Sequence, residues 1–150
     1  MLTNRALQGS TWLALSLSCA LFGGCAAPAP GDGSDVSFPD EPFATVTSEN
    51  GAFVVEVRTA PSQPPVRGRT YVELRIADEA GEPVEDLTLS AVPFMPDMAH
   101  GTSSEPEVAS LGDGRYEIAP VDMVMSGRWE LRTTVEAPVE DSARVQFEIE

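Results

Sequence analysis

Cysteine is scarce in this chain of 150 residues, and both cysteines, Cys19 and Cys25, lie within the first 25 residues. A domain formed by the rest of the chain therefore lacks a thiol for a disulfide, a thiolate metal site or a cysteine nucleophile. Lysine is absent, and histidine occurs once, at His100. With one imidazole and no glycine-rich phosphate loop, the sequence holds too few groups for a catalytic set, so we expect no enzyme activity.

Positive charge is also scarce, because nine arginines face 24 acidic residues and give a formal net charge of −15. Removal of residues 1–24 takes away Arg5 and no acid, which leaves eight arginines, 24 acids and a net charge of −16. Such a charge argues against nucleic acid as a partner and against electrostatic attraction to anionic lipid. It is typical of a self-repelling domain that attracts cations.

Long apolar runs are limited to the amino terminus. Arg5 is followed by a short apolar run over residues 11–24, which is below the about 20 apolar residues that a membrane-spanning helix needs. This pattern predicts a secretory signal peptide over residues 1–24. The run ends in Leu-Phe-Gly-Gly before Cys25, which resembles a bacterial lipobox and predicts lipidation of Cys25. Cleavage near Ala27 without lipidation is the alternative.

Lipidation would anchor the protein to a membrane without spanning it. We therefore expect a lipid-anchored protein of the bacterial cell envelope, on its periplasmic or extracellular face. The residue after Cys25 is alanine rather than aspartate. In a Gram-negative cell, that residue favours the outer membrane.

Proline, glycine, aspartate and serine dominate the segment after Cys25. Such a composition cannot bury enough apolar surface to fold, so residues 25–43 are predicted to form a flexible linker. From residue 44 the pattern changes to short runs of alternating apolar and polar residues. We therefore predict one folded domain over residues 44–150.

The runs in this domain recur every 10–20 residues with proline and glycine between them, and none shows a helical period. The pattern predicts an all-β fold, an immunoglobulin-like antiparallel β-sandwich of about seven strands. The expected core members are the single tryptophan of the domain, Trp129, and the large apolar residues Phe53, Val55, Leu74, Ile76, Leu89 and Phe147. The expected strands are residues 52–58, 70–76, 87–92, 107–109, 115–119, 128–135 and 143–149.

The methionines are clustered. Apart from the initiator, Met95 and Met98 lie in one short segment with His100, and Met123 and Met125 lie in another. Thioether and imidazole groups suit a soft metal ion, Cu(I) above all. Methionines that only fill a core are expected to be scattered along the chain. We therefore interpret these five residues as candidate ligands of copper.

The first segment is expected to form a loop at the end of a sheet. Pro93 and Pro96 flank Met95 and disfavour strand pairing, and Pro96 with the aspartate after it favours a turn. Met95, Met98 and His100 are therefore expected to lie close together and to face solvent. In an extended chain, Met123 and Met125 would share one face.

Other roles for these residues stay open. A methionine beside a strand commonly belongs to the core, and a single loop histidine is commonly an exposed polar residue. A second functional interpretation is a protein-interaction module without metal. In that case Phe94, Met95, Met98 and Met125 would form an exposed apolar patch that contacts an envelope partner.

Three segments carry a family resemblance: VPFMPDMAHG at residues 92–101, GDGRY at 112–116 and VDMVMSGRWEL at 121–131. They contain, in this order, a Met-Pro-x-Met-x-His motif, a Gly-x-Gly-x-Tyr hairpin and a Val-x-Met-x-x-x-Gly-x-Trp-x-Leu pattern. This order resembles the YtkA-like domain, which is related to FixH-like proteins and occurs in exported or membrane-anchored bacterial proteins. The resemblance covers roughly residues 45–150.

The resemblance implies an immunoglobulin-like sandwich outside the cytoplasm. Members of this family are associated with copper handling or with the assembly of haem–copper oxidases. An envelope copper protein or an oxidase-assembly factor is therefore an expected partner. The family residues carried over are Met95, Met98, His100 and Met123, and Met125 is an addition from the clustering argument.

Overall fold

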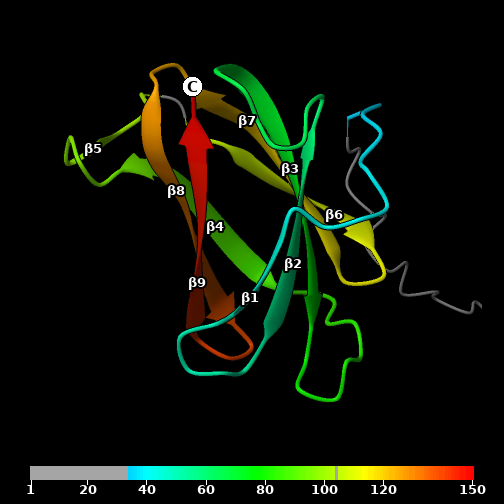
Figure 1. Cartoon of the computed structure of the whole chain (residues 1–150). Coiled ribbons are helices and arrows are strands. Elements are labelled where there is room, and N and C mark those ends of the chain that lie inside the picture. Colours follow the sequence, from blue (N-terminus) through cyan, green and yellow to red (C-terminus); the bar gives the residue numbers. More distant parts are fainter. Residues whose placement is uncertain (1–33, 104) are drawn as a thin grey trace, which may run out of the picture.

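The computed structural model describes residues 34–103 and 105–150, and these ranges form nine strands and no helix. One antiparallel sheet has the strand order β1-β2-β3-β7-β6, and the other has the order β5-β4-β8-β9. Figure 1 shows the two sheets packed face to face. The all-β sandwich predicted from the sequence is confirmed. The strands are β1 (Ala44–Thr47), β2 (Val54–Ala60), β3 (Gly68–Ala77), β4 (Thr88–Met95), β5 (His100–Gly101), β6 (Glu107–Gly112), β7 (Arg115–Met123), β8 (Gly127–Ala137) and β9 (Asp141–Ile149).

Seven of these strands correspond to the runs seen in the sequence, and β1 and β5 are additional. The predicted signal peptide and Cys25 lie outside the described residues. Within those residues, no helix is long and apolar enough to cross a membrane.

The core lies between the sheets and is formed by the side chains that point inward at alternate positions of the strands. Along β9, every second residue from Asp141 to Ile149 is buried, and along β8 the buried series includes Trp129 and Leu131. The two strands pair in register, with Trp129 opposite Phe147. Because successive side chains point to opposite faces of a strand, this register directs the apolar side chains of both strands towards the core. A core without disulfides is thereby held by packing alone, which a domain of this size can do.

Residues 34–40 lie against the outer face of the five-stranded sheet, and residues 41–43 lead into β1. The Ser34 amide donates to Glu117 Oε1 at 2.9 Å, and the Asp40 carbonyl accepts from Arg58 Nε and Nη2 at 3.2 Å each. The Phe43 amide donates to the carbonyl of Val57 at 2.7 Å. The part of the predicted linker that directly precedes β1 therefore makes specific contacts with the five-stranded sheet. We refer to residues 34–43 as the strap.

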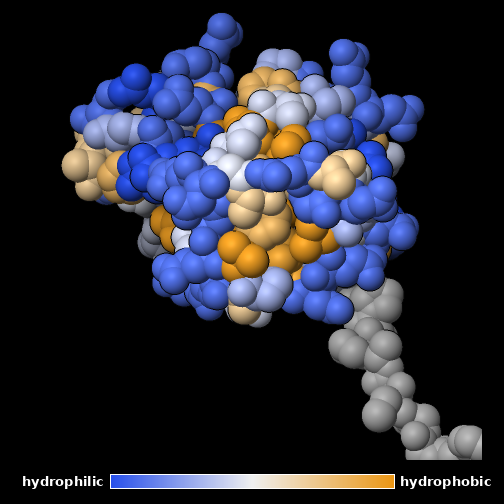
Figure 2. All heavy atoms as spheres, turned by 90° about the horizontal axis from the view of Figure 1, so that it is seen from below, coloured by the Kyte–Doolittle hydropathy of each residue, from blue (hydrophilic) through white to orange (hydrophobic). Residues whose placement is uncertain are grey.

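Hydrophilic side chains cover most of the molecular end that Figure 2 presents, with an apolar area near its centre. This is the end where the loops after β1, β3 and β8 lie in Figure 1. The hydrophilic cover agrees with the large excess of acidic residues in the chain. The connection from β7 to β8, which holds Met123 and Met125, lies at the other end of the sandwich, and the hairpin from β4 to β5 projects from its side (Figure 1).

Tyr116 joins β7 to the segment that leads into β4. Its buried hydroxyl accepts a hydrogen bond from the Leu87 amide at 3.1 Å and donates to the Val84 carbonyl at 3.0 Å. Burial raises the pKa of Tyr116 above its ordinary value of 10.0, and the hydrogen bond from Leu87 opposes that shift. The phenol therefore stays neutral and serves as a structural link.

We expect Tyr116→Phe to lower the free energy of unfolding by about 1–2 kcal/mol, because the buried Leu87 amide loses its acceptor. Tyr71→Phe is the matched control, since the half-buried Tyr71 hydroxyl has no hydrogen-bond partner among residues 34–103 and 105–150. Urea unfolding measures both variants. Equal midpoints for the two would contradict the proposed link.

Asp141 joins the start of β9 to the loop after β1. Its buried carboxylate accepts from the amides of Asn50 at 3.0 Å, Ala52 at 3.2 Å and Ser142 at 2.7 Å. Burial alone would raise the pKa of Asp141, but these bonds and one from the Ser48 hydroxyl outweigh burial and hold the pKa below its ordinary value of 3.8. The ionised form is therefore the one that stabilises the fold.

A lowered folded-state pKa means that Asp141 contributes stability above the ordinary pKa of 3.8, and that this stability is lost as pH falls through the folded-state pKa. We expect Asp141→Asn to cost about 1–3 kcal/mol at pH 7 and to flatten the acid limb of the stability profile. The neighbouring exposed Glu140→Gln is the control. Urea unfolding from pH 7 to pH 2 tests this, and parallel acid limbs for wild type and Asp141→Asn would refute it.

Candidate functional site

The first methionine segment forms a tight hairpin between β4 and β5. The Met98 amide donates to the Met95 carbonyl at 3.3 Å, and the Ala99 amide donates to the Pro96 carbonyl at 3.3 Å. Ala99 has a φ of 54°, a left-handed conformation that closes the turn. β5 then pairs with β4 so that His100 stands opposite Met95. The three candidate ligands of this segment are therefore held within one hairpin, which projects from the sandwich in Figure 1.

The expectation that Met95 faces solvent is wrong, because Met95 is only 4% exposed and belongs to the core. β4 continues through Pro93, which pairs with Leu131 of β8. β5 pairs only with Phe94 and Met95, so β4 is an edge strand at Pro93. Proline is tolerated on an edge strand, since its missing N–H removes no bond within the sheet.

Two glycines shape the surroundings of Met95. A Cβ on Gly101 would lie 2.7 Å from the Pro93 carbonyl oxygen, so only glycine allows β5 to approach β4 this closely. Gly127 has a φ of 124°, and a Cβ there would lie 3.1 Å from the Met95 methyl group. The Met95 thioether therefore reaches across to the first residue of β8.

The second methionine segment leads from β7 into β8. Met123, the last residue of β7, is 1% exposed and pairs with Gly68 of β3. Met125 is half-buried against the core, and its carbonyl accepts from Trp129 Nε1 at 2.9 Å. Met123 and Met125 precede Gly127 by four and two positions in the chain. Because the Met95 methyl group lies close to Gly127, the second methionine segment ends near Met95.

The candidate ligands differ in their access to solvent. Met98 is 59% exposed at the tip of the hairpin. His100 is also exposed, and its Nδ1 lies 2.9 Å from the Gly101 carbonyl oxygen. Met125 is half-buried, and Met95 and Met123 are buried. A metal ion arriving from solvent would meet Met98 and His100 first.

Sequence reasoning did not identify the ion pair that ties this hairpin to the sandwich. Arg128 Nη2 lies 2.7 Å from Asp97 Oδ1, and the two side chains are 42% and 60% exposed. An exposed pair of this kind is worth about 0–1 kcal/mol, so it orients the turn more than it stabilises it. The two residues are 31 positions apart, and no local sequence pattern predicts their pairing.

The donor set at this end is soft. Among residues 34–103 and 105–150, no group of three or more histidine, cysteine, aspartate or glutamate side chains could hold a metal ion. Thioethers are a different class of ligand, and with imidazole they favour Cu(I) over Zn(II). The chemistry available here is therefore coordination by sulfur and nitrogen.

Comparison with known families agrees with the motifs described above. The model of the YtkA-like family matches residues 45–134, well over half of the chain. The chain belongs to the YtkA-like family. The matched range runs from β1 into β8 and includes all five candidate ligands. No curated protein matches the chain.

The burial of the four methionines predicts their order of oxidation, because sulfoxide formation requires access to the sulfur. With hydrogen peroxide on the folded protein, we expect Met98 to react first and Met125 next, with Met95 and Met123 slower than Met98 by about tenfold or more. Peptide mass spectrometry measures each rate. Unfolding in urea is the control and should make the four rates similar; equal rates in the folded state would contradict the described burial.

Proposed function

We propose that this YtkA-like domain binds Cu(I) through the Met/His end of the sandwich. The observation that carries the proposal is the hairpin, which holds Met95, Met98 and His100 together through the Met98–Met95 backbone bond and the Met95–His100 register. Cu(I) favours soft ligands such as these. The exposed thioether of Met98 and the imidazole of His100 provide the initial contact.

Met125 is the best placed additional ligand, because it is half-buried on the adjoining connection. Met95 and Met123 are buried in the core and would join only through a change of side-chain conformation. A methionine side chain has three rotatable bonds and adapts readily to such a change. The proposal therefore assigns different roles to the five ligands, with Met98 and His100 first.

The biological role that we propose is copper handling or oxidase assembly by a lipoprotein of the bacterial cell envelope. Support comes from the family, from the lipobox-like sequence before Cys25 and from the acidic charge, which attracts cations. Lipid at Cys25 would hold the domain at a membrane. An envelope copper protein or an oxidase-assembly factor would be its partner.

A protein-interaction module without metal is the second candidate. Its support is the exposure of two apolar side chains at this end, Met98 and Val124, both 59% exposed. Phe94 and Met95 contribute less than the sequence suggests, since Met95 is buried and the Arg132 guanidinium covers the Phe94 ring at 3.7 Å. The candidate contact surface is thus small.

An anaerobic Cu(I) titration against a chromophoric chelator tests the first proposal. The protein is produced from residue 26 onward, which retains both sheets and the strap. We expect one Cu(I) per chain, and we expect Met98→Ala and His100→Ala each to weaken binding by about tenfold or more, since each removes a ligand. Both side chains are exposed, so neither change should unfold the domain.

Val139→Ala is the matched control, because Val139 is also an exposed apolar residue but lies in the loop between β8 and β9. Its Cu(I) affinity should equal that of the wild type. Unchanged affinity in both ligand variants would overturn the assignment of Met98 and His100. Absence of Cu(I) binding by the wild type would reject the copper proposal and leave the interaction module.

A further inference from the structure

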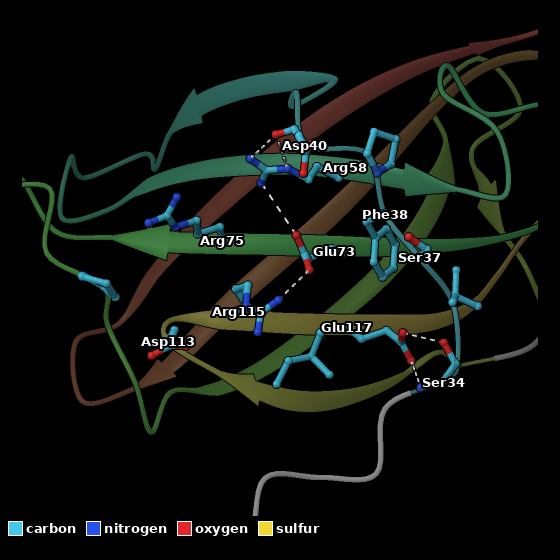
Figure 3. A pocket seen from close by; sticks show the side chains of 14 residues that line it. Ser34, Ser37, Phe38, Asp40, Arg58, Glu73, Arg75, Asp113, Arg115 and Glu117 are labelled. Atoms are coloured by element: carbon cyan, nitrogen blue, oxygen red, sulfur yellow. Dashed lines mark hydrogen bonds and ion pairs between the residues drawn. The ribbon is translucent and has the colours of Figure 1, made fainter.

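A cavity of about 730 Å³ lies on the outer face of the five-stranded sheet, away from the methionines. The strap forms one wall, and charged residues of β2, β3 and β7 form the floor, as Figure 3 shows. A cavity of this volume falls in the range of small-molecule sites, about 300–1,000 Å³. Neither the family nor the copper proposal accounts for it.

The floor carries two rows of charges of opposite sign. Glu73 of β3 pairs in register with Glu117 of β7, and two residues further along Arg75 pairs with Arg115. Directly opposed like charges in neighbouring strands destabilise a sheet unless other groups compensate them. Each row therefore requires partners of opposite charge or hydrogen-bonding groups.

The carboxylate row has such partners. Glu117 accepts from the Ser34 amide at 2.9 Å and from the Ser34 hydroxyl at 2.6 Å. Glu73 lies between two guanidinium groups, with Arg58 Nη1 at 3.7 Å and Arg115 Nη1 at 3.8 Å. The strap and the flanking arginines thus compensate both acids.

The guanidinium row is not compensated in the same way. Arg75 makes no side-chain hydrogen bond or ion pair within residues 34–103 and 105–150. Glu56 stands opposite Arg75, but its carboxylate lies 2.9 Å from Arg58. Among the residues that the structure describes, Arg115 has a single ion-pair contact, with Glu73 at 3.8 Å.

Arg58 contributes a further hydrogen-bond donor without a partner to the same cavity. Its Nη1 is buried and has no hydrogen-bond partner among the described residues, because Glu73 at 3.7 Å is beyond hydrogen-bond length. Buried donors in folded proteins are nearly always bonded to protein, water or ligand. Three of the arginines of this strongly acidic chain thus line one cavity with donors to spare.

We propose that this cavity binds a small organic anion whose carboxylate or phosphate group accepts hydrogen bonds from the arginines that line it, Arg75 among them. Guanidinium groups bind such oxyanions through paired N–H donors, and an anion in the cavity would offset the repulsion between the opposed Arg75 and Arg115. Asp113 and Glu73 also line the cavity, so the local charge suits a small anion rather than a polyanion. The net charge of −15 repels anions at long range, so affinity must come from the local donors.

The test is isothermal titration of the chain from residue 26 onward with citrate and, separately, with inorganic phosphate, at constant ionic strength. We expect binding of at least one of them with a Kd of about 1 mM or lower. Arg75→Gln should weaken that binding by about tenfold, since it removes a charged pair of donors. Arg75 is exposed, so this variant should keep the fold, and circular dichroism checks it.

Arg144→Gln is the matched control, because Arg144 is an exposed arginine of β9 in the other sheet, paired with Glu49. It should leave the affinity unchanged. Citrate binding that Arg75→Gln weakens would assign the site to carboxylates, and phosphate binding that it weakens would assign the site to phosphates. Absence of binding for both anions, or equal affinity in wild type and Arg75→Gln, would overturn the proposal.

Discussion

The packing of Trp129 between the two sheets is the interaction on which the rest of the molecule depends. Trp129 is almost fully buried, and its strand, β8, is hydrogen-bonded to β4 on one side and to β9 on the other. Its Nε1 donates to the Met125 carbonyl, which fixes the connection from β7. On β9, Phe147 stands opposite Trp129 and stacks on Phe43, the last residue of the strap, with ring centroids 5.5 Å apart. The same aromatic core therefore positions the methionine end and the strap that walls the cavity.

The strands of this core could be predicted from the sequence because alternation is a local property. Phe53, Leu74 and Phe147 were expected in the core and are buried there, whereas Leu89 is only partly buried. β1 and β5 were not predicted, because strands of four and two residues are too short to show an alternation of apolar and polar residues. Their pairing with β2 and β4 depends on tertiary contacts rather than on propensity.

The two candidate sites differ in how much of each could be predicted from the sequence. Clustering alone singled out Met98 and His100, and the structure places both in one hairpin. The sequence left open whether Met95 faces solvent or the core, because its burial depends on β4 continuing through Pro93 at an open sheet edge.

The charged cavity was not foreseen at all. The alternation of Glu73 with Arg75 indicates only a polar face of a strand, and the same is true of Arg115 and Glu117. Which charges meet depends on the register between β3 and β7, strands whose paired residues are 40 to 55 positions apart in the chain. Such a register follows from the whole core and not from either strand alone.

The long-range field of the protein acts in opposite directions on the two proposed ligands. With a net charge of −15, the chain attracts a monovalent copper cation and repels an organic anion. Salt screens both effects over about 10 Å at 0.1 M, so it would slow the encounter with Cu(I) and ease the approach of the anion. The proposed coordination by Met98 and His100 would be short-range and would survive screening, and so would the proposed hydrogen bonds from Arg75 and Arg115. The overall charge therefore governs arrival at each site, while the hairpin and the arginine row govern what is held there.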